Sequence, residues 1–270
     1  MGHELGIVGA GNMAEAIARS VIAGGVIRKE EIVAADVSAG RREVFAKQIG
    51  VRAVEKNEEA ARGARTILLS VKPQQMKEVL SGIGSLLSAD TLIVSIAAGI
   101  SSGFIEKNLG GGKAWRVIRA MPNTPMLMGK GMVALARGRN AGEADLARAR
   151  SIFEAGATVL ELNEEKMDAV TAMSGSGPAY FFYLVEQMIR AGVTLGLSQQ
   201  EAQVLAARTC IGAAAMLEGS QEGAAELRKK VTSPGGTTQA AIELMESKQM
   251  GEILVASIRR AAERSRELGT

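Results

Sequence analysis

The 270-residue sequence is poor in the side chains that most often catalyse reactions or hold metals. It contains one histidine, His3, and one cysteine, Cys210. A lone cysteine excludes an intrachain disulfide and cannot supply the several thiolates of a cysteine zinc site. His3 precedes the first predicted strand, so we expect a surface residue and not a catalyst. Histidine-dependent triads and histidine-rich metal sites are therefore excluded, and any chemistry must be carried by a cofactor.

Aromatic residues and long apolar runs are also scarce. Aromatics make up 3% of the chain, and the 32 basic residues are scattered, with a net charge of +3. A nucleic-acid-binding protein usually clusters its basic residues and supplies aromatics for stacking, so we expect no nucleic-acid partner. No apolar run approaches the length of a membrane span. The chain enters its first strand without a signal-like segment, so we expect a cytoplasmic protein with no membrane association.

A glycine-rich turn near the amino terminus is the strongest motif present. An apolar strand, 5–8, is followed at once by Gly9-Ala10-Gly11-Asn12-Met13-Ala14 and an amphipathic helix. Gly9 permits the tight turn, Gly11 allows a pyrophosphate to approach the backbone, and Ala14 lets helix and strand touch. The helix start offers N–H groups and positive dipole to phosphates. Strand, glycine turn and helix in this order predict dinucleotide binding.

A second predicted strand, 32–35, ends at an acidic residue. Asp36 lies 25 residues beyond Gly11, near the roughly 20 residues expected for an acid that binds the adenosine ribose. An aspartate there favours NADH and repels the 2′-phosphate of NADPH. Arg41 and Arg42 follow closely and are either phosphate-neutralising groups or surface residues at a helix start. The cofactor is therefore predicted to be NADPH or NADH.

Residues 1–162 alternate strand-like and helix-like segments. This alternation predicts an α/β fold, a Rossmann-like parallel sheet with helices on both faces. Ligands bind beyond the carboxyl ends of such strands. Besides the glycine turn, the candidate cofactor-binding segments at predicted strand ends are Ser70-Val71-Lys72-Pro73, Ala97-Ala98-Gly99 and Met121-Pro122-Asn123. The small residues of 97–99 would let a flat nicotinamide lie against the backbone.

Strand signals stop after residue 162, and 163–270 reads as an all-helical domain. The helix that begins after Ser198 is apolar nearly all round, a pattern typical of a helix buried in a bundle or an oligomer. Core packing explains most of this composition. So much apolar helix also favours an interlocked dimer.

One stretch of the helical half is rich in glycine and hydroxyl groups. Ser233-Pro234-Gly235-Gly236-Thr237-Thr238 opens a predicted helix. The backbone N–H groups of Gly236, Thr237 and Thr238 are candidates for holding a carboxylate, as helix amino termini do, with the Ser233 hydroxyl as a further donor. An interhelical turn with ordinary caps is the alternative.

Taken together, the motifs resemble those of the pyrroline-5-carboxylate reductase family, in the same order along essentially the whole chain. The stretches that carry the resemblance are Gly6 to Ala14, Val71-Lys72-Pro73, Arg119 to Pro125, Ser174 to Tyr180 and Ser233 to Glu246.

This resemblance implies reduction of the cyclic imine pyrroline-5-carboxylate to L-proline, the last step of proline biosynthesis. It also implies that the helical domain binds substrate and forms a homodimer, and that such dimers often assemble into decamers. Carried over by residue, Thr238 is the catalytic residue that bonds the imine nitrogen. Ser233 and the amides of 236–238 bind the substrate carboxylate, and Val231 packs against the substrate ring. Asn57 approaches the adenosine of the cofactor.

Three other functions are weighed against this one. The chain also resembles β-hydroxyacid dehydrogenases at Gly175-Ser176-Gly177, but Phe181 stands where their pattern calls for a catalytic lysine. Another imine reductase would share the same motifs. A non-catalytic NAD(P)-binding sensor would keep the phosphate-binding turn and need no substrate pocket, so the intact stretch 233–238 argues against it.

Overall fold

The computed structural model describes residues 2–269, which form two compact units. The first unit comprises the chain up to residue 176 together with the chain from 260 onward, and the second comprises 177–259. The division differs from the predicted boundary at residue 162. Residues 163–176 and the last turns of the final helix belong by their contacts to the sheet-containing unit.

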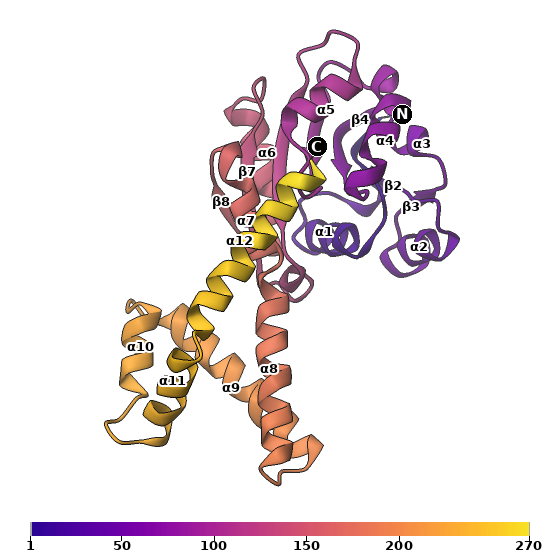
Figure 1. Ribbon diagram of the computed structural model, residues 1–270. Coiled ribbons are helices and arrows are strands. Elements are labelled where there is room, and N and C mark those ends of the chain that lie inside the picture. The colour runs from indigo at the N-terminus through magenta and orange to yellow at the C-terminus, as the bar shows by residue number, and fades with distance from the viewer. Residues whose placement is uncertain (1, 270) are drawn as a thin grey trace. The chain divides into compact units, whose positions relative to one another are not determined.

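An eight-stranded sheet is the centre of the first unit (Figure 1). Its strands are β1 (His3–Val8), β2 (Ile32–Ala35), β3 (Arg52–Val54), β4 (Ala64–Leu69), β5 (Leu92–Ser95), β6 (Arg116–Pro122), β7 (Gly131–Arg137) and β8 (Ala157–Glu161). The spatial order is β3-β2-β1-β4-β5-β6-β7-β8. Successive strands are therefore added on one side of β1 up to β3 and on its other side from β4 onward, while β1 and β4 stay parallel. The boundary between β1 and β4 is the switch point where ligands bind in doubly wound folds.

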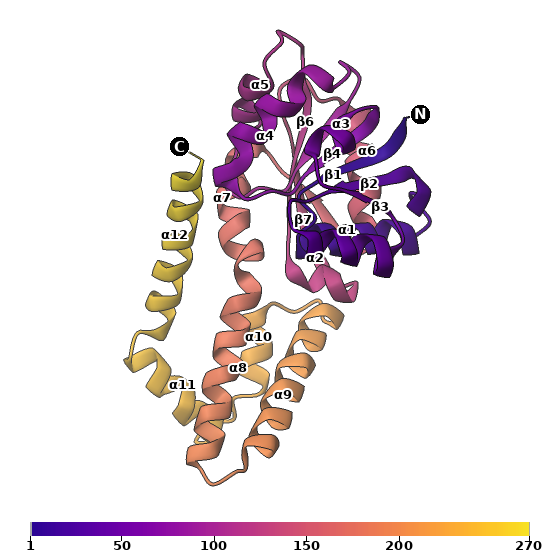
Figure 2. The ribbon, with the colours of Figure 1, turned by 90° about the vertical axis from the view of Figure 1, so that its right-hand side faces the viewer.

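Helices cover both faces of the sheet, as the sequence predicts (Figure 2). On one face lie α1 (Asn12–Ala23) and α6 (Glu143–Glu154), and on the other lie α4 (Met76–Ile83) and α5 (Ser102–Leu109). Successive strand residues point to opposite faces. Leu68 accordingly joins the core under α1, whereas Ile67 and Leu69 join the core under α4 and α5.

Three shorter helices also belong to this unit. They are α2 (Ala39–Glu43), which continues in a π-helical turn to Ile49, α3 (Asn57–Ala61) and α7 (Met167–Val170). The chain leaves the π-helical turn at Gly50, whose φ of 81° is in the left-handed region that suits glycine.

The far side of the sheet departs from the all-parallel prediction. β7 is antiparallel to β6, although its partner on the other side, β8, is parallel to it. The connection between β6 and β7, residues 123–130, is too short for the crossover that a parallel pair requires. The edge strand β8 is not among the predicted strands, and most of its residues are exposed.

The second unit is helical throughout its described length. It contains α8 (Gly177–Thr194), α9 (Gln199–Gly219), α10 (Ala224–Lys230), α11 (Thr237–Ser247) and the first part of α12 (Met250–Leu268). A Cβ at Gly192 of α8 would lie 3.0 Å from that of Ala202 of α9, so small residues allow these helices to meet closely.

Many apolar side chains of this unit are exposed within the single chain. On α9 the side chains of Ala202 and Ala206 are buried, whereas Val204, Leu205 and Ile211 are each more than half exposed. Exposed apolar side chains in such number are typical of an interaction surface, which fits the dimer that the sequence predicts.

Two further features concern membranes and metals. Within residues 2–269 we find no helix that combines the length and apolar character needed to cross a membrane. The same residues contain no cluster of three or more histidine, cysteine, aspartate or glutamate side chains suited to a metal ion.

Candidate functional site

The two glycines of the first turn have different surroundings. Gly9 has a φ of 93°, and a Cβ there would lie 2.9 Å from the Ser70 carbonyl carbon and from Val71 Cγ1. Gly11 has an ordinary φ of −72°, and a Cβ there would meet no atom within 4 Å. Gly9 is therefore required by the protein's own packing, whereas Gly11 faces open space.

The amino end of α1 lies directly behind that space. Gly11 is the N-cap of α1 and supplies no capping side chain. The first N–H groups of a helix lack partners within the helix, and the helix dipole makes this end positive. The arrangement suits the pyrophosphate that the sequence predicts, because the phosphate oxygens can reach the amides without steric hindrance.

Asp36 holds the glycine turn through its side chain. One carboxylate oxygen accepts the Ala10 N–H at 2.8 Å, and the other accepts the Ser38 N–H at 2.8 Å. The acid predicted to bind ribose thus lies beside the glycine turn at the end of β2. Its anchoring by two amides fixes the position of its negative charge.

Arg41 and Arg42 both reach back toward this turn. Arg41 Nε donates to the Ala10 carbonyl at 2.6 Å, and its guanidinium lies 2.8 Å from the Glu15 carboxylate. Arg42 donates to the Asp36 carbonyl at 2.9 Å. Partial burial raises the pKa of Glu15, but the hydrogen bonds from Arg41 and Arg19 outweigh it and hold the pKa below its usual value. Both arginines are therefore part of the turn's framework.

The segment after β4 is tied to the same turn. The Ser70 hydroxyl donates to the carbonyls of Val8 and Gly9. Lys72 is exposed and precedes a short 3-10 turn that starts at Pro73. The structure thus brings 70–73 to the carboxyl edge of the sheet, next to the glycine turn, as predicted from strand order.

The segment after β6 is linked to the beginning of the helical half. Asn123 accepts the Met132 N–H at 2.8 Å and donates to the Ser174 carbonyl at 3.3 Å. A Cβ at Gly175 would lie 2.5 Å from the Met121 Cε atom. The stretch around residue 175 therefore lies against the end of β6, in the first unit.

One sequence expectation changes, that for His3, and the structure also places Asn57. His3 is half-buried, and its Nε2 lies 2.9 Å from the Ala60 carbonyl. Burial lowers the pKa of His3 below its ordinary value. His3 thus belongs to β1 and is not the surface residue we expected. Asn57 begins α3, which contacts β1 and β2.

The predicted substrate motif opens α11 in the second unit. Gly236 is the N-cap of α11, and Thr237 and Thr238 are its first two residues. The Gly236 N–H already donates to the Ser233 carbonyl at 3.0 Å. It is therefore not one of the free donors that the sequence predicts, and the amides of Thr237 and Thr238 remain as candidates. Val231 is the C-cap of α10 and is more than half exposed.

Gln239 is a residue of this motif that the sequence analysis missed. Its Oε1 accepts the Gly235 N–H at 2.7 Å, and its Nε2 donates to Glu243 at 2.7 Å. Gly235 has a φ of 71°, in the left-handed region. The loop before α11 is thus fixed by a glycine conformation and by the hydrogen bond to the Gln239 side chain. A glutamine in the first turn after paired glycines is the signal that could have revealed it.

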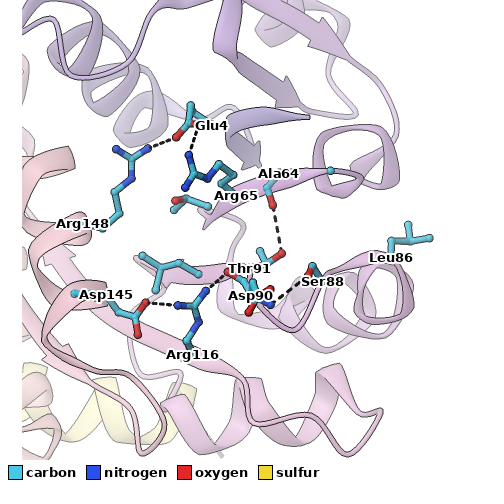
Figure 3. Close-up of a pocket in the computed structure, with 14 residues that line it drawn as sticks. Glu4, Ala64, Arg65, Leu86, Ser88, Asp90, Thr91, Arg116, Asp145 and Arg148 are labelled. Atoms are coloured by element: carbon cyan, nitrogen blue, oxygen red, sulfur yellow. Dashed lines mark hydrogen bonds and ion pairs between the residues drawn. The ribbon is translucent and has the colours of Figure 1, made fainter. Parts of the chain in front are cut away.

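A hollow of about 720 Å³ lies at the opposite edge of the sheet (Figure 3). It is lined by the amino-terminal ends of β1, β4, β5 and β6 and by the start of α6. Glu4 pairs with Arg65 at 3.0 Å and Arg148 at 3.1 Å, and Arg116 pairs with Asp145 at 3.0 Å. Each of these three guanidinium groups thus has a carboxylate partner, and Arg65 and Arg148 share that of Glu4. Because ligands of this fold bind at the carboxyl edge, we do not assign the cofactor to this hollow despite its size.

Two known family models match separate stretches of the chain. Residues 164–268 match the family model described as "Pyrroline-5-carboxylate reductase dimerisation". Residues 4–99 match the model described as "NADP oxidoreductase coenzyme F420-dependent". The match of the helical half to a dimerisation model agrees with its exposed apolar surface, and we conclude that the protein self-associates.

Individual relatives are similar over the whole length. The pyrroline-5-carboxylate reductase of Synechocystis is 40% identical over 269 residues, covering 100% of this chain and 99% of the relative. That of Pseudomonas aeruginosa is 41% identical, covering 98% and 96%. A solved Plasmodium falciparum pyrroline carboxylate reductase with NADP bound is 30% identical, with a TM-score of 0.89 over 99% of this chain and 98% of that one. The chain belongs to the pyrroline-5-carboxylate reductase family.

Proposed function

We propose that this protein reduces 1-pyrroline-5-carboxylate to L-proline with NADH or NADPH. The observation that carries the proposal is full-length similarity to reductases of this name, with the glycine turn and the 233–238 stretch both intact. The open space in front of Gly11 and the uncapped start of α1 supply what a dinucleotide needs.

The reaction requires orientation more than strong acid–base groups. A bound nicotinamide cofactor would supply the hydride to the imine carbon. The imine nitrogen of the substrate is basic enough to be partly protonated, and the protein must align the ring and support that proton. This demand fits a chain whose one histidine, His3, serves the fold through its bond to Ala60.

The start of α11 provides the groups suited to that task. We assign the substrate carboxylate to the amides of Thr237 and Thr238 and to the Ser233 hydroxyl, with Gly236 shaping the turn behind them. The Thr238 hydroxyl is assigned to the imine nitrogen. Val231 supplies an apolar wall for the ring methylenes.

The carboxyl edge of the sheet is assigned to the cofactor. The pyrophosphate would lie on the turn formed by Gly9, Ala10, Gly11, Asn12, Met13 and Ala14. Asp36 and Asn57 would serve the adenosine half. The nicotinamide half would contact Ser70, Val71, Lys72 and Pro73, then Ala97, Ala98 and Gly99, and finally Met121, Pro122 and Asn123.

Replacing Asp36 by serine is expected to shift cofactor preference toward NADPH. The carboxylate is fixed at the end of β2 by the amides of Ala10 and Ser38, so its charge would repel a 2′-phosphate. We expect the ratio of kcat/KM for NADPH to that for NADH to rise about tenfold, since removing a charge repulsion of about 1.4 kcal/mol changes a ratio tenfold. The exposed Asp90 is a control, because Asp90→Ser removes the same charge at the opposite edge. An unchanged ratio in Asp36→Ser would contradict this role.

The assembly and its location extend the same proposal. The dimer that the helical half supports would assemble further into a decamer, which sedimentation equilibrium can test. We place the enzyme in the cytoplasm, where the reduced cofactor is available, and subcellular fractionation tests that placement.

The direct test mixes purified protein with pyrroline-5-carboxylate and either reduced cofactor while absorbance at the nicotinamide band is followed. We expect oxidation that depends on the imine and yields L-proline. Omitting the imine gives the background rate. Cofactor binding without imine-dependent oxidation would overturn the proposal and favour a sensor.

A further inference from the structure

The turn after β5, residues 97–101, packs at Gly99 against residues 265–269 at the end of α12. Gly99 has a φ of 77°, and a Cβ there would collide with the Ser265 carbonyl and lie 3.1 Å from the Gly269 nitrogen. A Cβ at Gly269 would in turn collide with the Gly99 carbonyl. The backbones of 99 and 269 therefore meet directly, without room for a side chain on either.

A partly buried hydrogen bond fixes the last turns of α12 in this position. Ser265 is 2% exposed, and its hydroxyl donates to Asp168 of α7 at 2.6 Å. The Arg266 guanidinium lies 4.0 Å from the same carboxylate. These residues all belong to the first unit, so the contact is part of the sheet-containing unit itself.

The other end of the same turn is anchored independently. The Ser102 N–H, at the start of α5, donates to Glu164 at 2.6 Å, and the buried Arg119 also donates to Glu164 at 3.2 Å. Residues 97–101 are thus held by α5 at one end and supported by α12 at Gly99. Losing the α12 support would leave the turn attached but free to shift at Gly99.

We infer that Ser265 and Gly269 are positioning residues for the nicotinamide half of the cofactor, acting through the 97–99 turn. The inference rests on the proposed function, which assigns that turn to the nicotinamide. Ser265 bonds to Asp168 and Gly269 lies against Gly99, and neither partner belongs to the segments assigned to the phosphates or the adenosine. Their influence is therefore confined to one half of the dinucleotide.

The test compares binding of the whole cofactor with binding of its nicotinamide-free part. Titration calorimetry measures Kd for NADH and for ADP-ribose, or for NADPH and 2′-phospho-ADP-ribose if the wild type prefers that cofactor. In Ser265→Ala we expect about a fivefold weaker Kd for the reduced cofactor, because the loosened 97–99 turn must be ordered when the nicotinamide binds, and an unchanged Kd for the fragment. Gly269→Ala, which alters the contact close to the chain's end, should act in the same direction.

Ser151→Ala is the matched control, because the Ser151 hydroxyl bonds within its own helix to the Arg148 carbonyl. It should leave both Kd values unchanged. Wild-type protein that binds neither reduced cofactor would refute the proposed function itself. Normal binding by the wild type, with Ser265→Ala weakening both ligands equally or neither, would refute the positioning role alone.

Discussion

Thr238→Ala is expected to lower kcat/KM for pyrroline-5-carboxylate on the order of 100-fold, the lower range for loss of a positioned proton donor. Thr238 is the second residue of α11, and the loop before it is fixed by the Ser233 carbonyl and by Gln239. The hydroxyl therefore projects from a rigid helix start. Its loss removes the group that we assign to the imine nitrogen.

Thr238→Ser should retain activity within a few-fold, because it keeps the hydroxyl. Thr194→Ala is a control in the same unit, since the Thr194 hydroxyl donates to the Ala191 carbonyl of its own helix. Steady-state kinetics with varied imine at saturating cofactor measure all three. Near-native turnover in Thr238→Ala would remove Thr238 from the catalytic role.

Local patterns made the sheet and the glycine turn predictable from sequence. A short apolar run such as 66–69, soon followed by Lys72-Pro73, favours a buried strand over a helix because of its length, and the Gly9 to Ala14 pattern constrains a few adjacent residues. The structure places both as expected. The fold class follows because alternating strands and helices leave few alternatives.

Contacts between distant segments could not be predicted in this way. The antiparallel direction of β7 depends on how its short connection to β6 closes, and β8 is a short edge strand whose one neighbour in the sheet is β7. The approach of Gly269 to Gly99 joins residues far apart in sequence. Each residue looks locally like an ordinary turn glycine, so only the three-dimensional structure reveals the contact.

The sequence also does not reveal which hydrogen-bond donors of the candidate site are already engaged within the protein. The sequence indicates that amides near Gly236 face a helix start, but not that one of them already bonds to Ser233. Likewise, Asp36 is recognisable as an acid after a strand, whereas its bond to Ala10 depends on how β2 lies beside the turn. Motifs identify the groups available, and tertiary structure decides which are already engaged.

Gly11→Ala is expected to weaken cofactor binding about ten- to hundredfold while leaving the fold intact. A Cβ at Gly11 meets nothing within 4 Å, and the backbone φ of −72° suits alanine. The added methyl would instead occupy space assigned to the pyrophosphate, and such overpacking costs about 1–3 kcal/mol. The free energy of unfolding without cofactor should change by less than about 1 kcal/mol, the modest cost of replacing an N-cap glycine.

Gly9→Ala separates this effect from ordinary damage to the turn. Its Cβ would lie 2.9 Å from the Ser70 backbone, at a φ of 93°, so the variant should lose about 2 kcal/mol or more of stability even without cofactor. Denaturant unfolding and cofactor titration on both variants therefore give opposite patterns. Gly11→Ala should lose cofactor binding and keep its stability, whereas the main effect of Gly9→Ala should be a loss of stability. If Gly11→Ala bound cofactor as tightly as the wild type, the open space before α1 would not be the pyrophosphate site.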